Sequence, residues 1–393
     1  MLRPPRSRAQ LLRVAAASFS ALIICTPAHA DTIRSQQWYL NAMHAEEMWK
    51  SSTGSGVTIA VVDSGVNADE PDLKGQVLEG HDYSGEYVDG RSDEDGHGTR
   101  MALFIAGTGK GAGAYGLAPG AKVLPLRVAN PKSYKEQSTM MASAIRYAAD
   151  SDARVINISM AGWGQRPEED SAISYALAKG KLIFAGVGNT GDKDNAVQYP
   201  AATPGVIGVA AVNREVKAAP WSQHGPQVDL AAPGTDMVAP CTDGTGGLCT
   251  GDGTSDATAL ASASAALVWS AHPDWTANQV LRVLINTAGA PKSGEKRSDA
   301  IGYGVVRPRI ALQNPGDPGP ADVSPLPELA AAAPPANRTV TATARDVKAT
   351  GNDAGLLSTR NAVIAAAATA IALAVAVPMV ITRRRRKALA AQI

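Results

Sequence analysis

The sequence predicts a three-layer α/β fold with a central, mostly parallel sheet, followed near the C-terminus by a transmembrane helix. The first observation is that strand-like and helix-like segments alternate through the middle of the 393-residue chain, which is typical of parallel strands joined by helical crossovers. The second is that polar residues come directly after buried strands. The third is an apolar run over residues 361–382 that ends at a basic cluster.

The strands are expected where short β-branched, apolar runs occur, and the helices where longer apolar or amphipathic segments occur. Strands are predicted at 57–62, 122–128, 155–159, 182–187 and 206–212. Helices are predicted at 101–106, 139–149, 171–179 and 257–268. These segments fit one domain over residues 31–311, which is long enough to bury a single core.

The first 30 residues have the pattern of a secretory signal peptide. Four arginines precede an apolar stretch at 14–25, and small residues at 28 and 30 suit cleavage after Ala30. The apolar stretch is too short to span a bilayer. A lipoprotein signal with Cys25 acylated is the alternative, which the bulky Ile24 disfavours.

Residues 31–50 form a short lead into the domain, too short for a folded pro-domain. Its apolar residues recur at roughly helical spacing and are expected to dock on the domain surface. They are Trp38, Leu40, Met43, Met48 and Trp49.

The composition changes after Leu312. Residues 312–360 are rich in proline and alanine and are predicted to be an extended spacer. The run at 361–382 is long enough to cross a hydrocarbon core of about 30 Å, and the basic tail at 383–393 should remain in the cytoplasm, with the domain outside. The alternative for the apolar run is a buried, alanine-rich core helix.

The net charge and the cysteines of the chain limit which macromolecules and metals it could bind. The net charge is +1, and the excess of positive charge lies in the two membrane-flanking segments, which argues against a nucleic-acid partner. Cys241 and Cys249 remain after signal cleavage and are expected to form a disulfide in an exported protein. Without nearby histidines they do not indicate zinc. No cofactor or metal site is predicted, and structural calcium is left open.

Ser255 follows a glycine-rich turn, Asp252-Gly253-Thr254, and precedes the predicted helix at 257–268. A hydroxyl at a helix start lies beside free backbone N–H groups and the positive end of the helix dipole. An oxyanion formed by attack on a carbonyl would be stabilised there. Taken alone, this serine is more simply an N-cap.

Asp63 and His97 change that interpretation. Asp63 ends the predicted strand at 57–62, and His97 precedes the predicted helix at 101–106. A neutral imidazole can deprotonate a serine hydroxyl, and a carboxylate can orient the imidazole. Alone they would be a turn carboxylate and a helix-start histidine. Together with Ser255 they follow the chain order Asp, His, Ser, which is the order of subtilisin.

Residues 36–311 resemble the subtilisin-like serine peptidases, the subtilase family. The resemblance is in Asp63-Ser64-Gly65, His97-Gly98-Thr99, Gly188-Asn189 and Gly253-Thr254-Ser255. It implies an Asp63–His97–Ser255 triad and an acyl-enzyme, with the Asn189 amide donating to the oxyanion. The alternative for Asn189 is an ordinary turn residue.

The resemblance also implies a binding cleft for an extended polypeptide, which would pair with the protein backbone as an added strand. One wall of the specificity pocket would be Ser159-Met160-Ala161-Gly162, and the other would be Gly186, Val187 and Gly188. Met160 and Val187 favour an apolar pocket.

Some positions depart from the family pattern. Asp256 stands where an apolar residue is usual, Ala259 where proline is common, and Leu103 where glycine is common. A carboxylate next to the nucleophile opposes the developing negative charge, although it suits a helix start. We therefore expect slow or narrow activity.

The order of signal peptide, peptidase domain without a long pro-domain, proline-rich spacer and terminal span resembles the mycosins, membrane-anchored peptidases of actinobacterial type VII secretion. This resemblance implies an extracytoplasmic endopeptidase that acts on exported proteins, with the type VII membrane complex as a partner. The alternative is a weakly active or inactive protease fold that serves as a scaffold of that complex.

Overall fold

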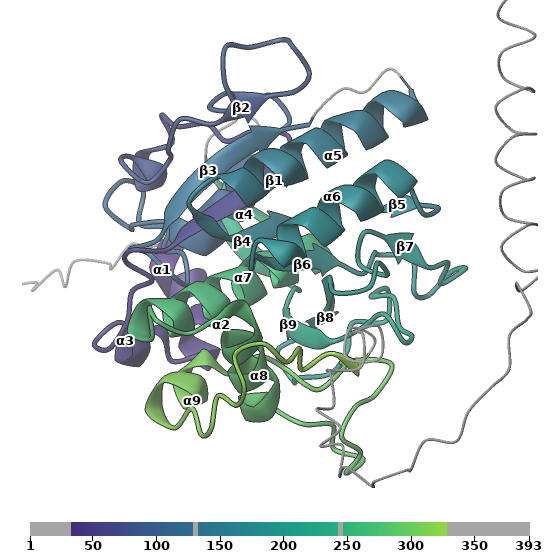
Figure 1. The fold of residues 1–393 in the computed structure, drawn as a ribbon. Helices are drawn as coiled ribbons and strands as arrows, with labels where there is room; N and C mark the ends of the chain where they lie inside the picture. The colour runs from purple at the N-terminus through teal and green to yellow at the C-terminus, as the bar shows by residue number, and fades with distance from the viewer. Residues whose placement is uncertain (1–32, 129–132, 243–246, 328–393) are drawn as a thin grey trace, which may run out of the picture. The chain divides into compact units, whose positions relative to one another are not determined.

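The structure is a computed structural model that describes residues 33–128, 133–242 and 247–327 (Figure 1). Within these residues, seven strands form one parallel sheet in the order β2-β3-β1-β4-β6-β8-β9. The strands are β1 Thr58–Asp63, β2 His81–Asp82, β3 Lys122–Arg127, β4 Ala153–Ile158, β6 Leu182–Gly186, β8 Ile207–Val212 and β9 Leu230–Pro233. The predicted parallel sheet is confirmed, and each predicted strand matches one of these to within about two residues.

Helices cover both faces of the sheet (Figure 1). Alternate residues of β1 separate into different apolar clusters: Ile59 and Val61 pack with helices α4 and α7, whereas Ala60 and Val62 pack with α5 and α6. This period of two is what a strand buried on both faces requires. The helices are α4 His97–Ala106, α5 Tyr134–Asp150, α6 Pro167–Ala178 and α7 Thr254–Ala271. The three-layer prediction is therefore confirmed.

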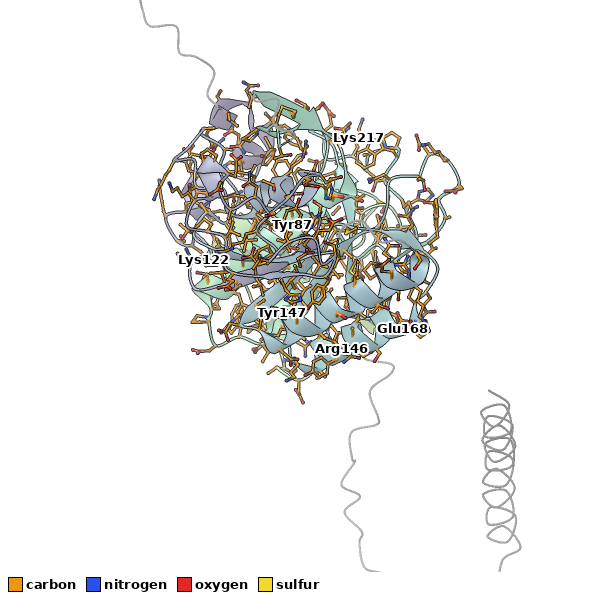
Figure 2. The ribbon with its side chains drawn as sticks, turned by 90° about the horizontal axis from the view of Figure 1, so that it is seen from above. Tyr87, Lys122, Arg146, Tyr147, Glu168 and Lys217 are labelled. Atoms are coloured by element: carbon orange, nitrogen blue, oxygen red, sulfur yellow. A yellow bond between two sulfur atoms is a disulfide. The ribbon has the colours of Figure 1, made fainter. Side chains whose placement is uncertain are left out.

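The outer face of α5 is exposed to solvent. Arg146 and Tyr147 lie there, as Figure 2 shows from above. Arg146 donates a hydrogen bond to Ser171 of α6 at 2.8 Å, so the two helices of this layer are linked at their outer surface.

The lead at the start of the domain folds as short helices, α1 Ile33–Gln36, α2 Trp38–Ala42 and α3 Ala45–Met48. It enters the core more deeply than surface docking would require, since Tyr39 and Leu40 are fully buried. The Tyr39 ring packs edge-on against Phe104 of α4, with ring centroids 5.6 Å apart. Trp38 is half-buried and donates its indole N–H to the Thr235 carbonyl.

The domain continues with α8 Ala277–Thr287 and α9 Pro308–Gln313. The first part of the predicted spacer, up to residue 327, then packs against α8. Arg282 donates to the carbonyls of Pro318 and Pro320, and Leu326 is buried. Prolines lack an N–H but keep the carbonyl as an acceptor, so polar side chains of α8 can hold this segment.

Short strand pairs lie beside the main sheet. β5 Gly162–Trp163 pairs with β7 Gln198–Tyr199, and β10 Met237–Pro240 pairs with β11 Leu248–Gly251, both antiparallel. The β10–β11 hairpin contains a disulfide between Cys241 and Cys249, with an S–S distance of 2.08 Å. The predicted cysteine pairing is confirmed.

The predicted signal peptide, the span at 361–382 and the basic tail lie outside the described residues. Among the residues that the structure does describe, none of the helices has the length and apolarity needed to cross a membrane.

The topology determines where functional groups can gather. After β1 the chain adds β2 and β3 on one side of it, and later β4, β6 and β8 on the other. In parallel sheets, ligands bind at the carboxyl ends of the strands next to such a reversal. Asp63 ends β1, Ser159 follows β4, and Asn189 follows β6, so all three lie at that edge.

Candidate active site

Asp63 and His97 are in direct contact. Asp63 Oδ1 lies 2.7 Å from His97 Nδ1 and also accepts the Ser64 backbone N–H at 2.8 Å. The Asp63 side chain is 2% exposed and the His97 side chain is 36% exposed. The carboxylate is therefore buried behind an imidazole that solvent can reach, and it fixes the orientation of the ring.

The first turn of α4 is fastened to the end of β1. The Gly98 N–H donates to Ser64 Oγ at 2.9 Å, and the Asp93 carboxylate accepts the N–H groups of Gly96 and Thr99. A Cβ atom on Gly98 would lie 2.1 Å from the Gly65 carbonyl oxygen. Only glycine allows the helix to approach the strand this closely, which explains why glycine follows His97.

The environment of His97 favours its charged form. Asp63 is the main cause, and it raises the pKa of the imidazole to about 9; burial opposes this shift, and Asp256 and Asp95 add to it. A histidine that is to accept a proton must first be neutral. The site is therefore prepared to stabilise the imidazolium that forms during proton transfer.

Ser255 is in the first turn of α7 and is partly exposed. Its hydroxyl donates to the Ser159 carbonyl at 3.0 Å, and the Ser159 hydroxyl donates to the Ser255 carbonyl at 3.1 Å. The Ser255 proton is thus directed to Ser159 rather than to His97. The structure brings Asp63 and His97 into contact, and it places Ser255 on the neighbouring helix.

Asn189 has a defined orientation. Its Oδ1 accepts hydrogen bonds from the Thr254 N–H at 3.0 Å and from the Thr254 hydroxyl at 2.9 Å. A backbone N–H can only donate, so the oxygen end of the amide must face Thr254. The NH₂ end therefore faces away from Thr254, and Asn189 lines the same cavity as Ser255.

That cavity has a volume of about 270 Å³. It is lined by Ser159, Met160, Ala161, Gly186, Gly188, Asn189, Thr190, Gln198, Thr254 and Ser255. Five predicted pocket residues, Ser159, Met160, Ala161, Gly186 and Gly188, are among them. A Cβ atom on Gly186 would lie 2.9 Å from Thr254 Oγ1, so glycine keeps this wall open.

Two predicted pocket residues do not line the cavity. Val187 is fully buried with Ile183 and Ala185 in the cluster under α5 and α6, because alternate residues of a strand share one face. Gly162 instead begins β5. The polar residues Thr190 and Gln198 line the cavity in addition, so this cavity is more polar than the pocket that Met160 and Val187 had led us to expect.

Asp256, the carboxylate next to Ser255, has a charged partner in the structure. Its side chain is 5% exposed, and one oxygen lies 3.1 Å from the Arg100 guanidinium. Burial raises the pKa of Asp256 to about 6, while Arg100 opposes that shift. The predicted electrostatic penalty on catalysis must therefore be reduced by this ion pair.

Four residues of the site had no role predicted from the sequence: Arg100, Thr190, Gln198 and Thr254. Thr254 could have been found because it stands directly before Ser255 at the helix start. The other three come from separate elements, and no local pattern connects them. Among the described residues, no group of three or more His, Cys, Asp or Glu side chains could hold a metal ion.

A family model for the subtilases, peptidase family S8, matches residues 54–304. The chain belongs to the subtilase family. Subtilases are subtilisin-like serine endopeptidases, and the match includes Asp63, His97 and Ser255. Family membership therefore agrees with the contact between aspartate and histidine at the end of β1.

Two subtilases are about a third identical to this chain over the residues that align. Fervidolysin from Fervidobacterium pennivorans is 30% identical over 317 residues, 73% of this chain and 45% of fervidolysin. Thermitase from Thermoactinomyces vulgaris is 37% identical over 205 residues, 51% of this chain and 71% of thermitase. The chain thus spans less than half of the length of fervidolysin.

Solved structures of this subtilase fold include proteases of type VII secretion. MycP1 from Mycobacterium smegmatis superposes with a TM-score of 0.64 at 28% identity, over 72% of this chain and 86% of MycP1. MycP3 from the type VII (ESX-3) secretion system superposes with a TM-score of 0.62 at 32% identity, over 70% of this chain and 87% of MycP3.

Proposed function

We propose that this subtilase is a membrane-anchored, extracytoplasmic serine endopeptidase that hydrolyses exported proteins. Ser255 is its nucleophile, His97 its general base and Asp63 the residue that orients His97. The observation that carries this proposal is the 2.7 Å contact between Asp63 and His97 beside the helix start that bears Ser255.

In the proposed reaction, Ser255 Oγ attacks the scissile carbonyl while His97 Nε2 takes the hydroxyl proton. The Asn189 NH₂ group and the Ser255 backbone N–H stabilise the oxyanion. The tetrahedral intermediate collapses, His97 protonates the leaving amine, and an acyl-enzyme remains. Water, deprotonated by His97, then releases the acyl group.

The Ser255 hydroxyl must leave Ser159 before it can react. A substrate added as a strand along Ser159–Gly162 would bring its own backbone N–H groups to the carbonyls of that segment. An N–H that donates to the Ser159 carbonyl competes with the Ser255 hydroxyl, which can then turn to His97. Substrate binding would in this way complete the catalytic arrangement.

Labelling with a fluorophosphonate probe tests the catalytic part of the proposal. We expect the wild-type domain to be labelled and Ser255→Ala to be unlabelled, with peptide hydrolysis lost in parallel. Ser270→Ala is the matched control, because Ser270 also donates to a backbone carbonyl but lies at the opposite end of α7 from Ser255. Labelling that persists in Ser255→Ala would assign the nucleophile to another residue.

Anchoring and export are supported by the sequence pattern at the two ends of the chain and by the similarity to MycP1 and MycP3. We expect the full-length protein to stay in the membrane pellet after carbonate extraction, and a chain ending at residue 327 to be released. N-terminal mapping of secreted proteins from wild-type and Ser255→Ala cells would then identify substrates as termini missing in the mutant.

A scaffold role in a secretion complex is the second candidate. MycP1 is an essential component of the type VII (ESX-1) secretion system, and in the present structure the Ser255 hydroxyl points to Ser159 rather than to the base. Normal secretion in Ser255→Ala cells, with loss of secretion in a deletion strain, would support the scaffold. Equal loss of secretion in both strains would support the peptidase.

A further inference from the structure

Arg100 lies on α4, one turn beyond His97, and its guanidinium is held on several sides. It contacts both oxygens of Asp256, at 3.1 and 3.4 Å, and donates to the Met237 carbonyl at 2.9 Å. It also lies over the Phe104 ring, 5.1 Å from the ring centroid. The side chains of Arg100 and Asp256 are 17% and 5% exposed, so this ion pair is largely removed from water.

The contacts of Arg100 connect three elements of the active site. Arg100 comes from the helix of His97, and Asp256 is next to Ser255 on α7. Met237 belongs to β10, opposite Gly251 of β11, and a Cβ atom on Gly251 would lie 2.8 Å from the guanidinium nitrogens. The hairpin that leads to Ser255 therefore has a glycine where Arg100 passes, because a side chain there would clash with the guanidinium.

We propose that Arg100 is a positioning residue for the proposed peptidase reaction: it locks the helix of His97 to the start of the helix of Ser255. The planar guanidinium is suited to this task, because it bonds a carboxylate through two nitrogens while donating to a carbonyl in another direction. Asp256, at the start of α7, is the partner that completes this connection.

The ion pair has a second effect on the reaction. An unpaired carboxylate next to Ser255 would oppose the negative charge of the oxyanion. With Arg100 in place, the pair is close to neutral. Removing Arg100 alone therefore harms the site twice, by freeing the two helices and by leaving a buried carboxylate without its partner, which is strongly unfavourable.

The inference rests on the proposed function, and steady-state kinetics of a peptide substrate separate the two. For Arg100→Met we expect kcat to fall by about tenfold or more, with KM within about twofold, because the loss is in the transition state. Arg34→Met is the matched control: Arg34 forms an ion pair of the same length, 3.1 Å, with Glu46 and is 16% exposed. Its kcat should stay at the wild-type value.

Two more variants keep the test decisive if Arg100→Met folds poorly. Arg100→Lys keeps the positive charge but lacks the planar guanidinium that bonds the carboxylate through two nitrogens. We expect an intermediate kcat for this variant. Arg100→Met/Asp256→Met removes both charges and should recover part of the kcat lost in Arg100→Met. Wild-type kcat in Arg100→Met or Arg100→Lys, with only the melting temperature lowered, would overturn the inference. An inactive wild-type domain would instead refute the proposed function.

Discussion

Ser159 and Ser255 exchange hydrogen bonds: each hydroxyl donates to the backbone carbonyl of the other, at 3.0 and 3.1 Å. The exchange joins the end of β4 to the first turn of α7, across the cavity that both residues line. Ser159 is itself held, because its hydroxyl accepts a hydrogen bond from the Asn157 side chain at 3.0 Å. The position of the nucleophile therefore depends on a buried polar chain behind it.

Ser159→Ala tests this dependence. The substitution removes the bond to the Ser255 carbonyl and leaves the fully buried Asn157 amide without an acceptor, at a cost of about 1–3 kcal/mol. We expect a lower melting temperature and a lower kcat. In Ser270→Ala, which removes an exposed hydroxyl-to-carbonyl bond, both should change little. An unchanged melting temperature in Ser159→Ala would show that the polar chain does not support the fold.

The pH dependence of kcat/KM should report His97. Because Asp63 raises the pKa of His97 to about 9, the neutral base is scarce at neutral pH. We expect kcat/KM to rise with pH until about 9, by about tenfold for each pH unit below it. In Asp63→Asn, the rise should move to lower pH while the maximum falls. A wild-type midpoint near 6.5 would contradict the strong influence of Asp63.

The same pKa shift affects folding stability. A histidine whose pKa is higher in the folded state stabilises the fold fully below its unfolded pKa of about 6.5. That contribution is lost as the pH rises through about 9. Urea unfolding of the wild type and of His97→Gln between pH 6 and pH 10 should show a difference that shrinks as the pH increases. A constant difference would exclude this linkage.

Asn189→Ala should lower kcat far more than it changes KM. Loss of one oxyanion donor typically costs about 10² to 10³ in kcat. The Thr254 N–H also loses its acceptor, so we expect a modest fall in the melting temperature. Asn278→Ala removes an amide that donates to the Ala321 carbonyl on the surface, and it should keep wild-type kinetics. Comparable kcat values for the two variants would remove Asn189 from the oxyanion site.

Gly98→Ala should damage both the fold and the site. The new Cβ would lie 2.1 Å from the Gly65 carbonyl oxygen and 3.0 Å from Asp63 Cβ, so α4 must move away from β1. We expect a loss of about 1–3 kcal/mol in stability, as for other overpacked sites, and a lower kcat. Gly289→Ala is the control, since its Cβ would make ordinary contacts, the nearest at 3.6 Å. Equal melting temperatures for both variants would argue against the close approach.

Short sequence patterns determined several elements of the fold and the catalytic residues that end or begin them. Strand β1 and the residue that ends it could be predicted because an apolar, β-branched run stops at Asp63. Helix α7 could be predicted because residues 257–268 are apolar or small without a charge or a helix breaker. Asp63, His97 and Ser255 could be joined in one hypothesis because their order along the chain is that of subtilisin. The carboxyl ends of parallel strands lie at one edge of the sheet, where catalytic groups gather.

Other features depend on contacts between distant segments, which no local pattern encodes. The charge of Asp256 is balanced by Arg100, 156 residues away in sequence, and the Ser255 hydroxyl faces Ser159, 96 residues away. The proline-rich residues up to 327 pack against α8 because Arg282 of that helix donates hydrogen bonds to their carbonyls. By itself, then, the sequence determined which elements form and which chemical groups end them, because apolar periodicity and turn residues act over a few positions. The tertiary structure alone decided which charges pair and where the reactive hydroxyl points, because burial and hydrogen-bond direction are set by segments that meet only after folding.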